Sequence, residues 1–185
     1  MTKRAFDIVF SVLGLIVAAP VIGLLVITVR RDSPGPGIFR QSRIGRNGTP
    51  FICLKLRTMR SDTPELPTHQ STQAQVTRLG RRLRQWKLDE LPQLWNVLAG
   101  DMSFVGPRPC LPSQTELIAE RRKRGVLAIR PGITGLAQIR GVDMSDPVRL
   151  AELDAEYLER MTVAADLKIL VGTFSRNALA DRTGE

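Results

Sequence analysis

The sequence has few of the residue types on which several kinds of functional site depend. Aromatic residues make up 5% of the 185 residues, and only one Tyr is present. Proteins that bind single-stranded nucleic acid stack the bases on aromatic side chains, so this composition argues against that class. The single His, His69, lies in the polar segment 63–75, which we interpret as a loop, and we assign it no chemistry.

Cysteine is equally scarce, with only Cys53 and Cys110. Two cysteines do not make a disulfide framework, and no Cys or His spacing of a zinc site is present. Cys53 lies in an apolar run, which predicts a small buried hydrophobic side chain. A reducing cytoplasmic environment is the simpler compartment for such a chain.

Positive charge, by contrast, is abundant. Lys and Arg number 27 against 18 acidic residues, a formal net charge of +9. This surplus suits nucleic acid, anionic lipid or phosphorylated substrates. Because base-stacking side chains are few, we expect no specific nucleic-acid partner and only weak, salt-sensitive association. The length suits one compact domain with its own core.

One long apolar run extends from residue 8 to residue 29 without a charge. As a straight helix it would reach about 33 Å, enough to span a hydrocarbon core. Pro20 in its middle disfavours a simple span, because proline removes a backbone hydrogen bond and bends a helix. Both flanks are basic: Lys3 and Arg4 precede the run, and Arg30 and Arg31 follow it. The positive-inside tendency holds both flanks in the cytoplasm, so we predict a re-entrant helix broken at Pro20.

Two adjacent carboxylates, Asp89 and Glu90, are the most informative feature of the sequence. They lie among basic residues: Arg78, Arg81, Arg82, Arg84, Lys87 and Arg108. Guanidinium groups bind phosphate oxygens, and a carboxylate holds a metal or attacks phosphorus. A structural role is also open, because the leucine spacing over 88–98 predicts a helix with Asp89 as its N-cap and Pro92 in its first turn.

The remaining pattern predicts a mainly helical α+β fold without internal repeats. We expect strands at 38–44 and 51–56, joined by an Asn-Gly hairpin turn, and helices at 76–85, from the capping box Ser113–Glu116 to before Gly125, at 147–160 after Asp146, and at 164–179. Amphipathic interfacial helices would surround the active site. The basic turn 121–124 is open to two interpretations, solvated charge or contact with anionic headgroups.

Six motifs occur in a characteristic order: DSPGPG at 32–37, FRQSRIG at 39–45, KLRTM at 55–59, LDELPQLWNVL at 88–98, GDMSFVGPRP at 100–109 and RPGITG at 130–135. Together they resemble the bacterial sugar transferases, and more narrowly the small monotopic phosphoglycosyl transferases. The resemblance runs from about Lys3 to Lys168. It supports a re-entrant membrane anchor over 1–31 and a single cytoplasmic catalytic unit over 32–185. Ala19 stands where the family commonly has Ser, so the break at Pro20 is less well specified here.

The resemblance also implies a reaction. A UDP-sugar would donate a phosphosugar to undecaprenyl phosphate, giving undecaprenyl-diphosphate-sugar and UMP. Asp89 matches the family's nucleophile, which would form a covalent aspartyl-phosphosugar. Glu90 would orient Asp89, assist the metal or handle a proton. Mg²⁺ is the implied cofactor, with Asp89 as its protein ligand.

The candidates for binding substrate phosphate are Arg84, Arg108 and Arg130, followed by Lys55 and Arg57. Gly132 and Gly135 would let backbone amides approach a phosphate. The expected location is the cytoplasmic face of the bacterial inner membrane, in lipopolysaccharide, exopolysaccharide or related glycoconjugate synthesis. The sequence does not specify the sugar, and it is compatible with a homodimer. The main alternative is a non-catalytic, membrane-anchored basic scaffold that only binds lipid.

Overall fold

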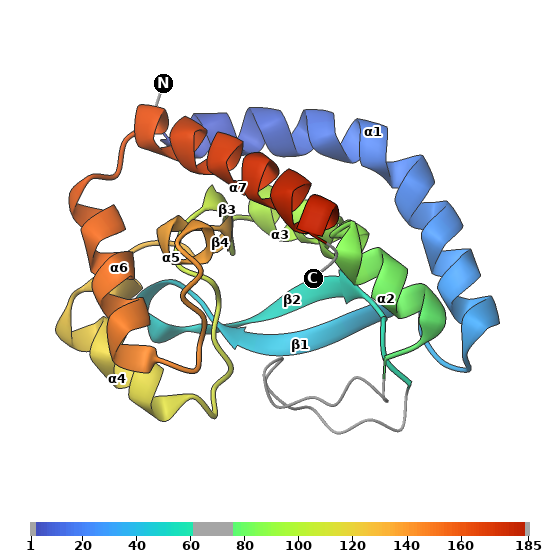
Figure 1. Cartoon of the computed structure of the whole chain (residues 1–185), viewed down its shortest axis with the longest axis horizontal. Coiled ribbons are helices and arrows are strands. Elements are labelled where there is room, and N and C mark those ends of the chain that lie inside the picture. The colour runs from blue at the N-terminus through green and yellow to red at the C-terminus, as the bar shows by residue number, and fades with distance from the viewer. Residues whose placement is uncertain (1–2, 61–75, 184–185) are drawn as a thin grey trace.

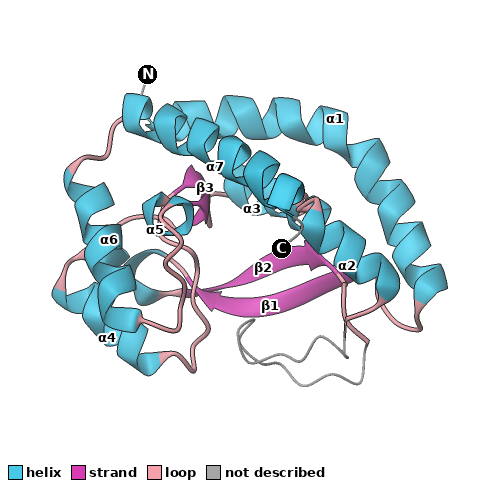
Figure 2. Cartoon of the chain, viewed as in Figure 1, coloured by secondary structure: helices cyan, strands magenta, loops and turns pink. Residues whose placement is uncertain are grey.

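The computed structural model describes residues 3–60 and 76–183. The segment 63–75, which contains His69, lies outside the described residues. The helices are α1 Lys3–Asp32, α2 Arg78–Gln85, α3 Gln93–Ala99, α4 Thr115–Lys123, α5 Leu136–Ile139, α6 Pro147–Glu159 and α7 Val163–Thr183. The strands are β1 Ile38–Ile44, β2 Pro50–Leu56, β3 Ser103–Val105 and β4 Gly132–Thr134. Figure 2 shows that helices dominate, which confirms the predicted mainly helical α+β class.

The N-terminal helix α1 is long and apolar enough to cross a membrane. Its helical structure continues through Pro20, and it changes direction partway along its length (Figure 1). The predicted break is therefore a bend in one helix and not an interruption between two. Large side chains such as Ile16, Val17 and Leu24 are exposed on it.

Both ends of α1 are bonded to the rest of the protein. At the N-terminal end, Arg4 donates to the carbonyls of Val97 and Leu98 at 2.7 and 2.8 Å, and the buried Asp7 accepts from Ser103 Oγ at 3.0 Å. At the other end, Leu25, Val26 and Val29 pack against Leu56 and Leu83. The two ends of the apolar helix therefore contact one body.

The predicted hairpin is present, with β1 and β2 antiparallel and Ile38 opposite Leu56. Asn47 and Gly48 in its turn both have positive φ, 58° and 78°, which explains the Asn-Gly signal. Cys53 on β2 is buried in an apolar cluster, as predicted.

The parallel pair β3–β4 was not predicted, because its strands are three residues long and their pairing is non-local. Its glycines are required for close approach of main chains. A Cβ on Gly132 would lie 2.1 Å from Gly106 N, and one on Gly135 would lie 2.3 Å from Gly106 O. The structure therefore uses Gly132 and Gly135 for packing against the β3 segment, and the prediction that they admit a phosphate is not supported.

The sequence predicted the start of α6 correctly and the start of α4 wrongly. Asp146 caps α6, accepting from Arg149 N at 3.0 Å, as predicted. The capping box at Ser113 is wrong: α4 begins after Gln114, whose side chain accepts from Leu111 N and does not cap the helix. The core beneath these helices includes Leu117 of α4 and residues of α5 and α6.

Candidate functional site

The two acidic residues lie in a 3₁₀ turn, Leu88–Glu90, between α2 and α3. Lys87 enters this turn with a left-handed φ of 52°, and Glu90 N bonds to Lys87 O at 3.2 Å. The prediction that Asp89 is the N-cap of α3 is therefore wrong, because α3 begins only at Gln93. Pro92 directly precedes the helix and offers no capping side chain; the first-turn donors Leu94 N and Trp95 N bond instead to the carbonyls of Leu91 and Pro92, each at 3.1 Å. Asp89 is thereby available for another role.

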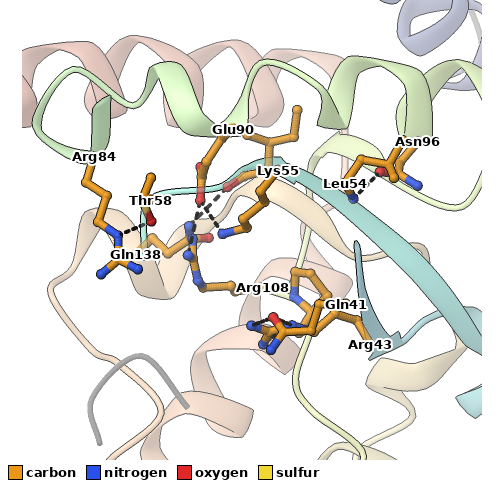
Figure 3. Close-up of polar contacts among 12 residues, drawn as sticks. Gln41, Arg43, Leu54, Lys55, Thr58, Arg84, Glu90, Asn96, Arg108 and Gln138 are labelled. Atoms are coloured by element: carbon orange, nitrogen blue, oxygen red, sulfur yellow. Dashed lines mark hydrogen bonds and ion pairs between the residues drawn. The ribbon is translucent and has the colours of Figure 1, made fainter. Parts of the chain in front are cut away.

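Asn96 fixes α3 against the hairpin. Its side chain accepts from Leu54 N at 3.0 Å (Figure 3). It also donates to Ile52 O at 2.7 Å, so it satisfies main-chain groups along the open edge of β2. Lys55 lies beside this attachment point. Sequence reasoning missed Asn96, although a buried amide in an apolar helix was a usable signal.

Glu90 is held by two cations. Lys55 Nζ lies 2.9 Å and Arg108 Nη2 lies 3.2 Å from its Oε1 (Figure 3). Burial opposes ionisation of Glu90, but Arg108, Lys55 and the hydrogen bond from Lys55 together lower its pKa to about 2. Glu90 is therefore a permanent anion at neutral pH.

Asp89 is in a different environment although it is the next residue. Its side chain is buried, with 8% relative exposure, and burial together with the Glu90 charge raises its pKa to about 6, against the opposing effects of Lys55 and Arg84. Among the described residues, no side chain forms a hydrogen bond or ion pair with its carboxylate. Apart from a hydrogen bond with its own backbone, the carboxylate is thus available to an incoming group.

Arg84 extends from α2 toward the same site. Its Nε donates to Thr58 Oγ1 at 2.9 Å, which fixes the side chain while leaving its Nη groups directed away from Thr58 (Figure 3). Burial lowers the pKa of Arg84, and the nearby Asp89 carboxylate opposes this. The structure therefore brings Arg84, Lys55 and Arg108 together around the acidic pair, and their binding of substrate phosphate stays a prediction.

Two other predicted phosphate-binding residues lie elsewhere. Arg57 is buried, and its guanidinium donates to the carbonyls of Ser33 and Pro34 just after α1. Arg130 Nε donates to Gly100 O at 2.7 Å, at the C-terminal end of α3, whereas Asp89 precedes the N-terminal end. Both arginines bind main-chain carbonyls, so the geometry gives neither a place beside the acidic pair.

The separation of two neighbouring carboxyl groups into a permanent anion and a group that titrates near neutrality is typical of catalytic pairs with divided roles. An ionised Asp89 surrounded by cations can attack an electrophilic centre such as phosphorus. The cations Lys55, Arg84 and Arg108 are suited to a phosphate group approaching it. Acyl or phosphoryl transfer fits this arrangement better than a passive charged surface does.

Comparisons with known proteins agree with this chemistry. The family model described as bacterial sugar transferase matches residues 1–179. The UDP-glucose:undecaprenyl-phosphate glucose-1-phosphate transferase of Caulobacter vibrioides is 41% identical, over 94% of this chain and 68% of its own length. The undecaprenyl-phosphate glucose phosphotransferase of Komagataeibacter xylinus is also 41% identical, but the chain spans only 37% of it. The exopolysaccharide production protein PSS of Rhizobium leguminosarum is 38% identical, over 92% of both chains.

Proposed function

Because the chain belongs to the bacterial sugar transferase family, we propose that it moves a phosphosugar from a UDP-sugar to undecaprenyl phosphate, giving undecaprenyl-diphosphate-sugar and UMP. The relatives named above support the substrate classes, since two of them carry undecaprenyl phosphate in their names. The observation on which the proposal depends most is the buried Asp89 carboxylate, which no described side chain binds, beside a Glu90 whose Oε1 is bound by two cations.

In the proposed reaction, an Asp89 oxygen attacks the sugar-bearing phosphorus and the bond to the UMP phosphate breaks. The product is an aspartyl-phosphosugar and free UMP. An oxygen of undecaprenyl phosphate then attacks the same phosphorus and releases the Asp89 carboxylate unchanged. A covalent intermediate lets a soluble donor and a lipid acceptor use one site in turn.

Of the three roles considered for Glu90, namely orienting Asp89, assisting the metal and handling a proton, its low pKa disfavours the last. Since its pKa is held at about 2 by Arg108 and Lys55 against the effect of burial, it carries no proton to transfer near pH 7. Its contacts instead fix the two cations that we propose bind the donor phosphates. We therefore propose that Glu90 organises Lys55 and Arg108 beside Asp89.

Mg²⁺ fits the donor set. Within the described ranges no three His, Cys, Asp or Glu side chains gather as a metal cluster, and Mg²⁺ is commonly held by one or two carboxylates together with substrate phosphates. Asp89 has an oxygen to offer, whereas Glu90 is engaged by cations. We propose Asp89 as the protein ligand; the bound ion would offset the negative charge of the diphosphate.

The contacts of α1 support a monotopic location at the cytoplasmic face of the bacterial inner membrane. Arg4 at one end and Val29 at the other both contact the same catalytic body. A helix of this length that spanned the bilayer would place its ends about 45 Å apart on opposite sides, whereas contacts of both ends with one body favour ends on the same side. The exposed middle of α1 would therefore enter one leaflet and return.

Intact-mass spectrometry tests the proposal. Detergent-solubilised protein is incubated with Mg²⁺ and a panel of UDP-sugars, and UMP release is followed after undecaprenyl phosphate is added. We expect the mass of one phosphosugar on the protein with the preferred donor, and neither adduct nor turnover in Asp89→Asn. Full turnover in Asp89→Asn, or kinetics that require both substrates together without an adduct, would contradict it.

A further inference from the structure

The loop that carries Arg108 is held through the main-chain carbonyls of three consecutive residues, 107–109. Pro107 and Pro109 lack N–H groups and have fixed φ, so this loop mainly presents carbonyl groups. Each carbonyl has its own donor: Gly132 N binds Pro107 O at 2.9 Å, Arg121 Nη1 binds Arg108 O at 2.9 Å, and Arg43 Nη1 binds Pro109 O at 3.0 Å. The direction in which Arg108 leaves the backbone is therefore set by elements far away in the sequence.

Arg121 is the most distinctive of these donors. It is 2% exposed on α4, and its Nε and Nη2 lie 2.9 and 2.7 Å from Oδ2 of the equally buried Asp154 on α6. Desolvation offsets much of the attraction in a buried ion pair, so stability alone is a weak explanation for this one. The planar guanidinium does fix the geometry of both its partners, the Asp154 carboxylate and the Arg108 carbonyl.

We infer that Arg121, held by Asp154, is a positioning residue that aims Arg108 at Glu90 and at the diphosphate of the donor. This inference rests on the proposed function. Of the two arginines, Arg108 contacts Glu90 directly, with Nη2 3.2 Å from Oε1, whereas Arg121 acts through the Arg108 carbonyl. Asp154, Arg121, Arg108 and Glu90 thus form a continuous chain of contacts.

Arg121→Lys tests the inference because it keeps the charge but loses the fork that holds two partners at once. We expect kcat/KM for the UDP-sugar to fall about 10- to 100-fold, as for a small misplacement of a substrate-binding group. In an Arg108→Ala background the same substitution should change kcat/KM by less than about twofold, because its effect passes through Arg108. Asp154→Asn provides a second variant of similar shape if Arg121→Lys does not fold.

The matched control is Arg140→Lys. Arg140 also pairs with a carboxylate of α6, Glu156 at 2.6 Å, but on an exposed face and without contact to the Arg108 loop. It should leave kcat/KM unchanged. Loss of kcat/KM by the same factor with and without Arg108 would overturn the inference, since a merely structural role predicts that result.

Nitrogen-15 relaxation of the Arg108 Nε–H group gives a readout that needs no turnover. In detergent-solubilised protein without substrate we expect an ordered group, and an order parameter below about 0.6 in Arg121→Lys. Unchanged relaxation would overturn the positioning role even in an active enzyme. A protein that releases no UMP would refute the proposed function instead, and the relaxation result would still decide this inference.

Discussion

Lys55 Nζ lies 2.9 Å from Glu90 Oε1, and this contact joins the hairpin strand β2 to the turn that carries the acidic pair. It also divides the pair electrostatically. Glu90 takes the cations as direct partners, while its negative charge adds to the burial that raises the pKa of Asp89 to about 6. The fold therefore raises the pKa of one carboxyl group and lowers that of its neighbour.

Neutralising each carboxylate in turn should change stability in opposite directions. Burial and the neighbouring Glu90 charge raise the pKa of Asp89 from its ordinary 3.8 to about 6, so its charge at pH 7 lowers stability by about 2 to 3 kcal/mol. Asp89→Asn should then raise the free energy of unfolding by about that amount while abolishing UMP release. Glu90→Gln should lower it by about 1 to 3 kcal/mol, because the pKa of Glu90 is depressed to about 2.

Urea unfolding of the detergent-solubilised variants at pH 7 measures both values. Asp146→Asn, at the exposed cap of α6, is the control for changing an acid to its amide away from the site. A shift of the same sign for Asp89→Asn and Glu90→Gln would contradict the division of roles.

The stability difference at Asp89 should depend on pH. A carboxyl group with a raised pKa stabilises the fold in its protonated form, fully below the unfolded value near 3.8, and this contribution is lost as the pH rises through about 6. The advantage of Asp89→Asn over the wild type should therefore be near zero at pH 4 and reach its maximum above pH 7. Carbon-13 NMR of the Asp89 carboxyl in protein treated with a chelator reports the same pKa directly; a midpoint near 4 would contradict it.

Much of the site follows from the sequence, and the exceptions have physical reasons. The order of motifs pointed to Asp89 and Glu90. The hairpin was predicted from its Asn-Gly pair, because these residues readily adopt the positive φ that Asn47 has in the structure. Arg57 was misplaced because β2 ends at Leu56, so the alternation that places Lys55 at the site does not extend to it. Arg130 could not be assigned from sequence either, because a guanidinium binds a phosphate or a distant main-chain carbonyl with the same groups.

Replacing Lys55 and Arg57 should therefore have different consequences. Arg57→Lys leaves buried carbonyls after α1 with fewer donors, and should lower stability by about 2 to 3 kcal/mol without raising KM for the UDP-sugar. Lys55→Met should raise KM or lower kcat, because it removes a cation from the acidic pair. Thermal unfolding and steady-state kinetics of the two variants give the comparison. A raised KM in fully folded Arg57→Lys would show that Arg57 contributes to binding of the donor.

The path of α1 predicts the same accessibility for both of its ends. Since Arg4 and Val29 contact one body, a membrane-impermeant thiol reagent should reach cysteines introduced at Thr2 and Arg31 only from the cytoplasmic side. Native Cys53 and Cys110 should stay unlabelled, because both are buried and burial raises the pKa of each thiol. A cysteine at Val17, which is 74% exposed on α1, should react only after detergent removes the lipid. Labelling of Thr2 and Arg31 positions from opposite sides of sealed vesicles would show that α1 spans the bilayer and would refute the monotopic arrangement.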